Sequence, residues 1–281
     1  MIDRLAPRRR PSGIPVLHQR WHGLVFLHWA FAPETLRPLV PPGLALDCFD
    51  GRAWVGVTPF SVTRMRPSFL PPLPGASRAD EINVRIYVQR EGVPGIWFPS
   101  LEITNRLALL GARIAYRLPY FHAAMRVDRD GDTVSFRSER SGAARATLDA
   151  QWRLGRPRAP AEPGSLDFFL IERYVLYSGD RTTLLRGRIH HRPWPLREVT
   201  VLRLASTLLE ACGLPSPSAP VPVARAGRAV RRRSVATAAD LSAAADNGPS
   251  EPQRRRPPPA PGRSSTAARR RRSNPSPSAG R

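Results

Sequence analysis

The eight residues EINVRIYV, at positions 81–88, place polar or amphipathic side chains at every second position. These side chains are Glu81, Asn83, Arg85 and Tyr87, and the residues between them are all β-branched and apolar. Because successive side chains of a strand point to opposite faces, this alternation predicts a strand with one hydrophilic face. If that face lines a pocket, Arg85 can bind a carboxylate through its planar guanidinium. Glu81 would then serve as a hydrogen-bond acceptor or a base.

Two other interpretations of this face need no ligand. If Glu81 and Arg85 pair with each other inside the protein, they form an internal ion pair of a kind that often serves structure alone. If the face lies against solvent, its charges are simply hydrated. The sequence does not decide among these arrangements. We therefore take Glu81, Asn83 and Arg85 as candidate ligand-binding residues, and Glu81 as the candidate catalytic base.

The sequence lacks the motifs of several well-defined enzyme classes. It contains no dinucleotide fingerprint, P-loop, HExxH or GxSxG pattern. Its six histidines lack the spacing of a metal site: His190 and His191, for example, are neighbours in an expected strand and so point to opposite faces. We expect neither a metal nor a cofactor.

The charge of the chain is large but unevenly distributed. The net charge is +22 over 281 residues, and all 44 basic residues are Arg. Residues 221–281 carry 14 of these Arg and only three acids, whereas residues 1–220 carry 30 Arg and 19 acids. A high positive charge is typical of nucleic-acid binding, which normally uses both Lys and Arg. An all-Arg, Pro-rich and Ala-rich composition instead indicates a GC-biased genome, so we expect nucleic-acid binding only through residues 221–281.

Composition also predicts where the chain folds. Residues 221–281 contain no Trp, Tyr, Phe, Ile or Met, so they bury too little apolar surface to offset the entropy lost on ordering. We expect a disordered Arg/Pro-rich tail there, a disordered N-terminus over 1–13 and one folded domain over 14–220. The tail is either a genuine basic segment that contacts nucleic acid or acidic lipid, or the product of a shifted reading frame.

The folded part is expected to be β-dominated and α+β. Period-two runs and turn signals predict strands, and a period near 3.6 predicts helices after Asn105 and after Ser165. Many antiparallel strands with two or three helices exclude a doubly wound sheet. Strands are expected at 20–31, 44–49, 52–62, 81–88, 96–103, 125–140 and 182–194, and helices at 104–116, at 165–177 and at the end of 196–213.

Cysteine usage and hydropathy indicate a cytoplasmic protein. Cys48 and Cys212 are far apart and form no C-x-x-C motif, as expected in a reducing compartment. No apolar segment follows the early Arg8–Arg10 run, so no signal peptide is expected. The longest apolar run, 24–31, is too short to span a bilayer. We expect no membrane partner, and the sequence leaves the oligomeric state open.

Several motifs in unbroken order carry a resemblance to a known family. They run from FLHWAF (26–31) through EINVRIYV, GIWFPSLEITNRLALLGARIAY (95–116) and FFLIERYVLY (168–177) to HHRPWPL (190–196). Over roughly residues 14–215 the chain resembles the YqjF-like family of uncharacterised proteins and, more distantly, the acetoacetate decarboxylase superfamily. The resemblance implies an antiparallel β-barrel or sandwich with flanking helices around a central cavity. It also implies a further aromatic strand after the Gly213-Leu214-Pro215 turn, where this chain has its Arg-rich tail.

The same resemblance bears on the chemistry. In acetoacetate decarboxylase a Lys forms a Schiff base with the keto acid. The run similar to the one carrying that Lys is here Arg117-Leu118-Pro119-Tyr120, which puts Tyr120 where the amine would be and makes it a fourth candidate ligand-binding residue. The chain has no Lys at all, and Arg stays protonated. Schiff-base decarboxylation is therefore excluded, although Glu81 resembles the pocket Glu of the superfamily.

Three functions follow as hypotheses. The leading one is that a central cavity lined by Glu81, Asn83, Arg85 and Tyr120 binds a small polar or anionic organic molecule. The first alternative is a non-covalent lyase or hydrolase that uses Glu81 as general base. The second is binding of nucleic acid or an anionic surface through the basic tail. Residues Glu102, Asn105 and Arg113 are weaker candidates for the same cavity, with capping or exposed roles equally expected.

Overall fold

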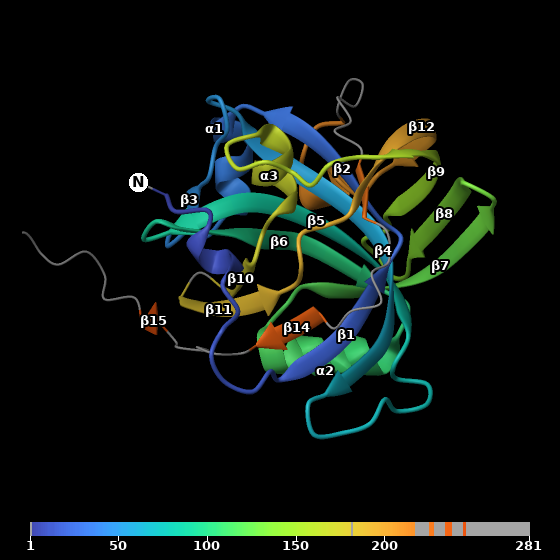
Figure 1. The fold of residues 1–281 in the computed structure, drawn as a ribbon, viewed down its shortest axis with the longest axis horizontal. Coiled ribbons are helices and arrows are strands. Elements are labelled where there is room, and N and C mark those ends of the chain that lie inside the picture. Colours follow the sequence, from blue (N-terminus) through green and yellow to red (C-terminus); the bar gives the residue numbers. More distant parts are fainter. Residues whose placement is uncertain (1, 181, 217–224, 228–233, 238–243, 246–281) are drawn as a thin grey trace, which may run out of the picture. The chain divides into compact units, whose positions relative to one another are not determined.

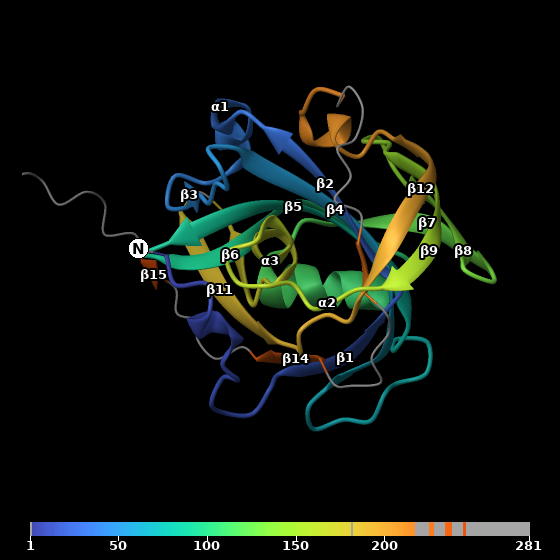
Figure 2. The same ribbon diagram turned by 45° about the horizontal axis from the view of Figure 1, so that its top comes forward.

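Most of the described chain is folded into β-strands (Figures 1 and 2). The structure is a computed structural model, and it describes residues 2–180, 182–216, 225–227, 234–237 and 244–245. The strands are β1 Leu17–His22, β2 Leu24–Phe31, β3 Ala45–Leu46, β4 Ala53–Pro67, β5 Ala79–Arg90, β6 Val93–Ile103, β7 Tyr120–Asp130, β8 Thr133–Arg140, β9 Thr147–Pro157, β10 Val175–Gly179, β11 Thr183–His190, β12 Leu196–Ser206, β13 Arg225–Gly227, β14 Ser234–Thr237 and β15 Ala244–Ala245.

The helices are short. The α-helices are α1 Pro33–Leu36, α2 Arg106–Tyr116 and α3 Leu166–Ile171, and the 3₁₀ turns are η1 Ala6–Arg8, η2 Arg37–Leu39 and η3 Glu210–Cys212. Two helices begin at capping side chains: the side chain of Asn105 accepts from the first turn of α2, and that of Ser165 accepts from the amide of Phe168 in α3. Gly213 ends η3 in a left-handed conformation. A β-dominated α+β domain is thus confirmed.

The strands form a single mixed sheet. Its central path runs β10-β6-β7-β8-β9-β12, and β5 lies between β4 and β6. Most neighbouring strands pair antiparallel, as expected, but β6 runs parallel to both β7 and β10. The reason is connectivity: α2 links β6 to β7, and a helical connection allows the chain to return in the same direction.

Strand β5 is buried on both faces. Its β-branched residues, including Ile82 and Val84, pack in one apolar cluster with β2, β4, β8 and β9. On the other face, Tyr87 packs in a second cluster with residues of β2, β6 and α3. The hydrophilic face of EINVRIYV therefore points into the protein, and the interpretation of a solvated face is wrong.

Three elements differ from the expected boundaries. The strand predicted over 20–31 is divided at Gly23, whose φ of 63° breaks the extended backbone. The hairpin predicted around Asp50-Gly51 consists of a single bridge, Phe49–Arg52, because β3 pairs with β5 instead of β4. The helix predicted over 165–177 ends at Ile171, and the β-branched and aromatic residues after it join the sheet as β10.

The two ends of the chain are described in part. Residues 2–13, for which disorder was expected, are described, and Arg4 and Arg8 contact the rest of the fold through Asp47 and Phe168. Of the tail at 221–281, only β13, β14 and β15 lie within the described residues. In the described ranges, no helix has both the length and the apolar character needed to cross a bilayer.

Candidate functional site

A cavity of about 450 Å³ lies against the hydrophilic face of β5. Its wall is formed by β1, β2, β4, β5, β6, α2, β7, α3, β10 and β11, and most of its lining side chains are apolar. All four candidate ligand-binding residues line it: Glu81, Asn83, Arg85 and Tyr120. A cavity of this size is typical of small-molecule sites, which are mostly apolar with a few placed polar groups.

Strand β5 fixes three of these residues relative to one another. Glu81, Asn83 and Arg85 alternate along a strand that is hydrogen-bonded to β4 on one side and β6 on the other. The exposed fractions of Glu81 and Arg85 are only 7% and 6%. Four residues along a strand separate their Cα atoms by roughly 13 Å. The charged residues therefore face the same cavity from separate positions.

Glu81 is paired with Tyr120 instead of Arg85. The Tyr120 hydroxyl donates a 2.6 Å hydrogen bond to Glu81 Oε1. Burial raises the pKa of Glu81 to about 7, and the hydrogen bond from Tyr120 partly opposes that rise. The pKa of Tyr120 is raised well above its usual value, first by burial and then by the adjacent carboxylate. At neutral pH, Glu81 is thus poised between its protonated and ionised forms.

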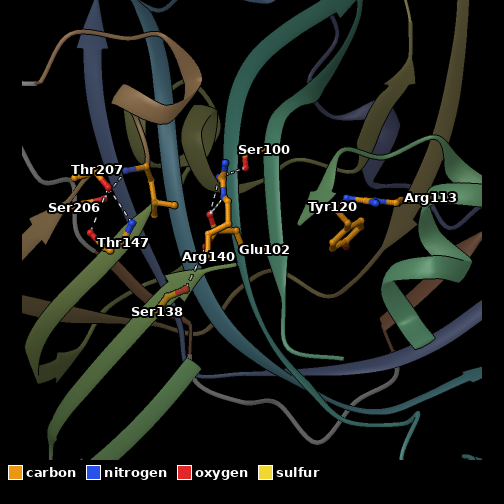
Figure 3. A network of polar contacts seen from close by, with 10 residues as sticks. Ser100, Glu102, Arg113, Tyr120, Ser138, Arg140, Thr147, Ser206 and Thr207 are labelled. Atoms are coloured by element: carbon orange, nitrogen blue, oxygen red, sulfur yellow. Dashed lines mark hydrogen bonds and ion pairs between the residues drawn. The ribbon is translucent and has the colours of Figure 1, made fainter. Parts of the chain in front are cut away.

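The helix α2 helps to hold Tyr120 in place. Parallel pairing sets Tyr120 of β7 beside Leu101 of β6. Arg113 of α2 then donates from Nε to the Tyr120 carbonyl oxygen over 2.8 Å (Figure 3). Arg113 was a weak candidate for the cavity; its observed contact supports the backbone of Tyr120.

Arg85 lies in the cavity wall without a carboxylate partner among the described residues. It donates to the Thr58 hydroxyl, and its guanidinium lies 5.0 Å from the centre of the Phe26 ring. Its Nε atom is buried and has no hydrogen-bond partner in the described chain. Burial lowers the pKa of Arg85. Because a buried charge is costly until it is paired, this guanidinium favours an anionic ligand.

Gly56 makes room for Arg85. The two residues are paired across β4 and β5. A Cβ atom at Gly56 would lie 3.1 Å from Arg85 Nε and 3.0 Å from a ring carbon of His28. A larger residue at position 56 would therefore push directly on the guanidinium.

Arg173 also lines the cavity. It donates from Nη1 to Asp47 Oδ2 over 2.7 Å, and its guanidinium lies 4.3 Å from the centre of the Phe169 ring. Its Nη2 atom is buried without a partner among the described residues. The sequence did not indicate Arg173 as a cavity residue because it lies far from β5 along the chain. Only the folded sheet brings α3 and the residues after it to the cavity.

His191 and Trp21 also contribute polar groups to the lining of the cavity. Burial lowers the pKa of His191 to about 4, so the ring is neutral near pH 7. It packs between Tyr174 and Trp194, with ring centroids 4.3 and 4.5 Å away. Trp21 Nε1 is buried and lacks a hydrogen-bond partner in the described chain. No sequence motif marks either residue.

Other candidates lie outside the cavity. Glu102, on the opposite side of β6, forms a buried ion pair with Arg140 at 2.7 Å, and Ser100 and Ser138 complete the network (Figure 3). Asn105 caps α2. Neither belongs to the wall of the cavity, and the capping role that was equally expected holds for Asn105.

His28 has a structural role in the core. Its Nε2 atom lies 2.7 Å from the Tyr87 hydroxyl, which donates to the Leu170 carbonyl oxygen. His28 is thus a fully buried, hydrogen-bonded core residue. In the part of the chain that the structure describes, no three His, Cys, Asp or Glu side chains are grouped as a metal site would require.

Solved structures show the class of fold. The enduracididine biosynthesis enzyme MppR, complexed with pyruvate, matches with a TM-score of 0.53 and 14% identity, over 80% of this chain and 88% of MppR. An acetoacetate decarboxylase-like enzyme from Sphingomonas wittichii RW1 matches with a TM-score of 0.51 and 15% identity, over 78% of this chain and 94% of that enzyme. The chain therefore has an acetoacetate decarboxylase-like fold.

Sequence comparison then shows the family to which the chain belongs. Residues 18–230 match DUF2071, a family of uncharacterized conserved proteins. The uncharacterized protein YqjF of Bacillus subtilis strain 168 is 40% identical over 207 residues, which are 74% of this chain and 86% of YqjF. The chain belongs to the DUF2071 family, and the YqjF-like resemblance is confirmed.

Proposed function

We propose that this protein binds a small organic anion, with a carboxylate held by Arg85 and an apolar body against the cavity wall. One observation carries the proposal: four buried polar atoms of cavity-lining residues have no hydrogen-bond partner within the described chain. They are Trp21 Nε1, Asn83 Oδ1, Arg85 Nε and Arg173 Nη2. Native proteins rarely leave buried polar groups unpaired, and such groups often mark functional sites.

The charges on the wall favour a carboxylate over a neutral ligand. Arg85 has no acidic partner among the described residues, and Arg173 shares Asp47 with Arg4. Bidentate pairing of a carboxylate with a guanidinium would use the free Nε of Arg85. Apolar walls such as Phe60 and Phe98 favour a hydrocarbon or aromatic remainder.

Differential scanning fluorimetry with matched ligands tests this proposal. The panel contains pyruvate, hexanoate and benzoate, with hexanol and benzylamine as uncharged and cationic counterparts. Pyruvate is included because MppR, which shares the fold, is seen in complex with it. A ligand at a hundred times its Kd stabilises by about 2.7 kcal/mol, which is roughly 5–10 °C for a domain of this size.

The decisive comparison uses two Arg variants. Arg85→Met keeps the apolar stem and removes the charge, whereas Arg153→Met makes the same change at an exposed position of β9. We expect at least one acid to stabilise the wild type and Arg153→Met but not Arg85→Met. Equal responses of wild type and Arg85→Met, or equal responses to acids and their counterparts, would contradict the proposal.

A second candidate function is supported by Glu81. A buried carboxyl with a pKa of about 7 is matched to general acid–base catalysis near neutral pH. On this hypothesis the protein is a non-covalent lyase or hydrolase acting on the bound acid, and the absence of Lys continues to exclude a Schiff base. To test this hypothesis, a stabilising acid is incubated with the wild type and with Glu81→Gln, and each mixture is followed by NMR. Turnover by the wild type alone supports catalysis. No turnover by either protein contradicts catalysis and leaves the binding function.

The third hypothesis, binding of nucleic acid or an anionic surface through residues 221–281, concerns a segment that lies mostly outside the described residues. Deleting 221–281 and measuring binding to duplex DNA separates it from the cavity. Loss of DNA binding with retained response to acids supports two independent sites.

A further inference from the structure

Large apolar side chains are exposed on α2 and on the loop between β4 and β5. Among the described residues, eleven large apolar side chains are exposed, and six of them come from these two segments. We call these six the apolar rim: Phe69, Leu70, Leu73, Leu107, Leu110 and Ile114. Their exposed fractions run from 48% to 82%.

The helix α2 exposes three of its four large aliphatic side chains, and the fourth, Leu109, packs on the core. Leu107, Leu110 and Ile114 follow the spacing of one helix face, and their side chains are 67%, 55% and 73% exposed. The small residues Ala108 and Ala112 line the cavity instead. A surface helix normally turns its large apolar residues toward the core. The described chain therefore leaves three large apolar side chains of α2 uncovered.

The two segments of the rim adjoin each other at the mouth of the cavity. Asn105, the cap of α2, donates from Nδ2 to the carbonyl oxygens of Gly75 and Arg78, over 2.7 and 3.0 Å. Leu73 and Leu107 line the cavity although both are exposed, so its wall reaches the surface here. In Figure 1, α2 and the β4–β5 loop lie together near β1.

A third exposed segment continues this surface. Ile14 and Val16, just before β1, are 66% and 45% exposed. The amide of Ser68, at the start of the β4–β5 loop, donates to the Val16 carbonyl oxygen over 3.1 Å. The apolar surface therefore extends from α2 across the loop to the start of β1.

The three chain segments that carry these exposed apolar side chains are basic. Residues 14–22, 63–78 and 104–117 contain seven Arg and no Asp or Glu. Of the seven, Arg117 has an acidic partner in the described chain, Asp180 at 3.4 Å. A second copy of the chain would bring these Arg residues against one another. The chain's own tail, 221–281, has 14 Arg and three acids and would also be repelled.

We propose that the apolar rim docks on the surface of an anionic lipid bilayer. Apolar side chains insert into the boundary between headgroups and acyl chains, and Arg residues beside them pair with anionic headgroups. The rim supplies the apolar side chains, and the Arg residues of its segments other than Arg113 and Arg117, which have partners in the chain, supply the positive charge. Docking in this orientation would place the cavity mouth at the bilayer. The proposal depends on the surface alone, so it does not require the ligand proposed above.

Vesicle sedimentation with the full-length chain tests this inference. The vesicles are phosphatidylcholine alone or phosphatidylcholine mixed with phosphatidylglycerol in equal parts. The rim variant is Leu107→Gln/Leu110→Gln/Ile114→Gln, since Gln keeps helix propensity. The matched control is Leu202→Gln, at an exposed leucine of β12, 43% exposed and far along the chain from the rim. Phe69→Gln, at the loop, is a second rim variant.

We expect wild type and Leu202→Gln to bind the anionic vesicles and not pure phosphatidylcholine. The α2 variant should bind at least tenfold more weakly, with unchanged circular dichroism and melting temperature, and Phe69→Gln should also be weakened. Binding of the α2 variant at wild-type strength would overturn the proposal and assign lipid binding to the tail. Failure of the wild type to bind would overturn it too. The proposal would also be overturned if analytical ultracentrifugation showed the wild type as a dimer and the α2 variant as a monomer.

Discussion

Glu81 and Arg85 face the same cavity from one strand, yet each has a different partner: Glu81 accepts from Tyr120, and Arg85 donates to Thr58. Their separation along β5 explains this, since four extended residues place the two side chains at different positions of the wall. A negative group and a positive group thus remain available to one ligand. An internal ion pair would have left neither available.

The pH dependence of stability should report the burial of Glu81. Its pKa is about 7 in the folded protein and 4.5 when unperturbed. A raised folded pKa contributes stability that is fully present below the unfolded pKa and is lost as pH rises through the folded one. Between pH 4.5 and 7 the wild type should therefore lose about 3 kcal/mol relative to Glu81→Gln. Urea unfolding of both proteins at several pH values measures this difference, and parallel pH profiles would contradict it.

Removing the Tyr120 hydroxyl should shift the same titration. The hydrogen bond from Tyr120 lowers the pKa of Glu81, so Tyr120→Phe should move that pKa upward. The carboxyl carbon of Glu81, followed by NMR against pH in selectively labelled protein, gives the value directly. Tyr116→Phe, which alters a different phenol of the cavity wall, is the control and should leave the titration unchanged. A downward shift in Tyr120→Phe would mean that the hydroxyl does not stabilise the carboxylate.

Gly56→Ala should weaken ligand binding through Arg85 without changing any charge. The added Cβ would meet Arg85 Nε at 3.1 Å, which forces the guanidinium to move. We expect the affinity for a stabilising carboxylate to fall at least tenfold, as measured by isothermal titration calorimetry. The control is Gly111→Ala, because Gly111 also lines the cavity but has open space around its Cβ position. Equal affinities of the two variants would place the anion away from Arg85.

The alternation of polar and apolar residues along EINVRIYV predicted the strand. The family resemblance predicted the cavity and the place of Tyr120 in its wall. The sequence did not show whether the hydrophilic face points to solvent or into the protein. A strand with alternating polar and apolar residues is normally half exposed, and the same pattern arises when its polar face lines an internal cavity. Periodicity likewise found α2 but did not show that Leu107, Leu110 and Ile114 face outward. An amphipathic pattern identifies two faces of a helix, and the surrounding chain decides which one is covered.

Long-range contacts account for what the sequence could not show. Arg173 reaches Asp47 across 126 residues, and no local pattern joins the two. The helix expected over 165–177 was too long because helical spacing of Phe168, Ile171 and Val175 continues into residues that the sheet captures as β10. In this part of the chain, pairing with β6 and β11 overrides local propensity.

The last prediction concerns Asp47, which is 1% exposed and accepts from both Arg173 and Arg4. Asp47→Asn should destabilise the fold by about 3–5 kcal/mol, because it leaves the buried Arg173 without its counter-charge. Arg4→Ala removes the other, partly exposed partner and should cost only about 1 kcal/mol or less. Urea midpoints of the three proteins at pH 8 measure both effects. If Arg4→Ala costs as much as Asp47→Asn, then the N-terminal segment, and not the Arg173 pair, is what Asp47 stabilises. If instead Asp47→Asn is nearly neutral, the Arg173 charge is balanced from the cavity side, and the affinity of that variant for small carboxylates should rise.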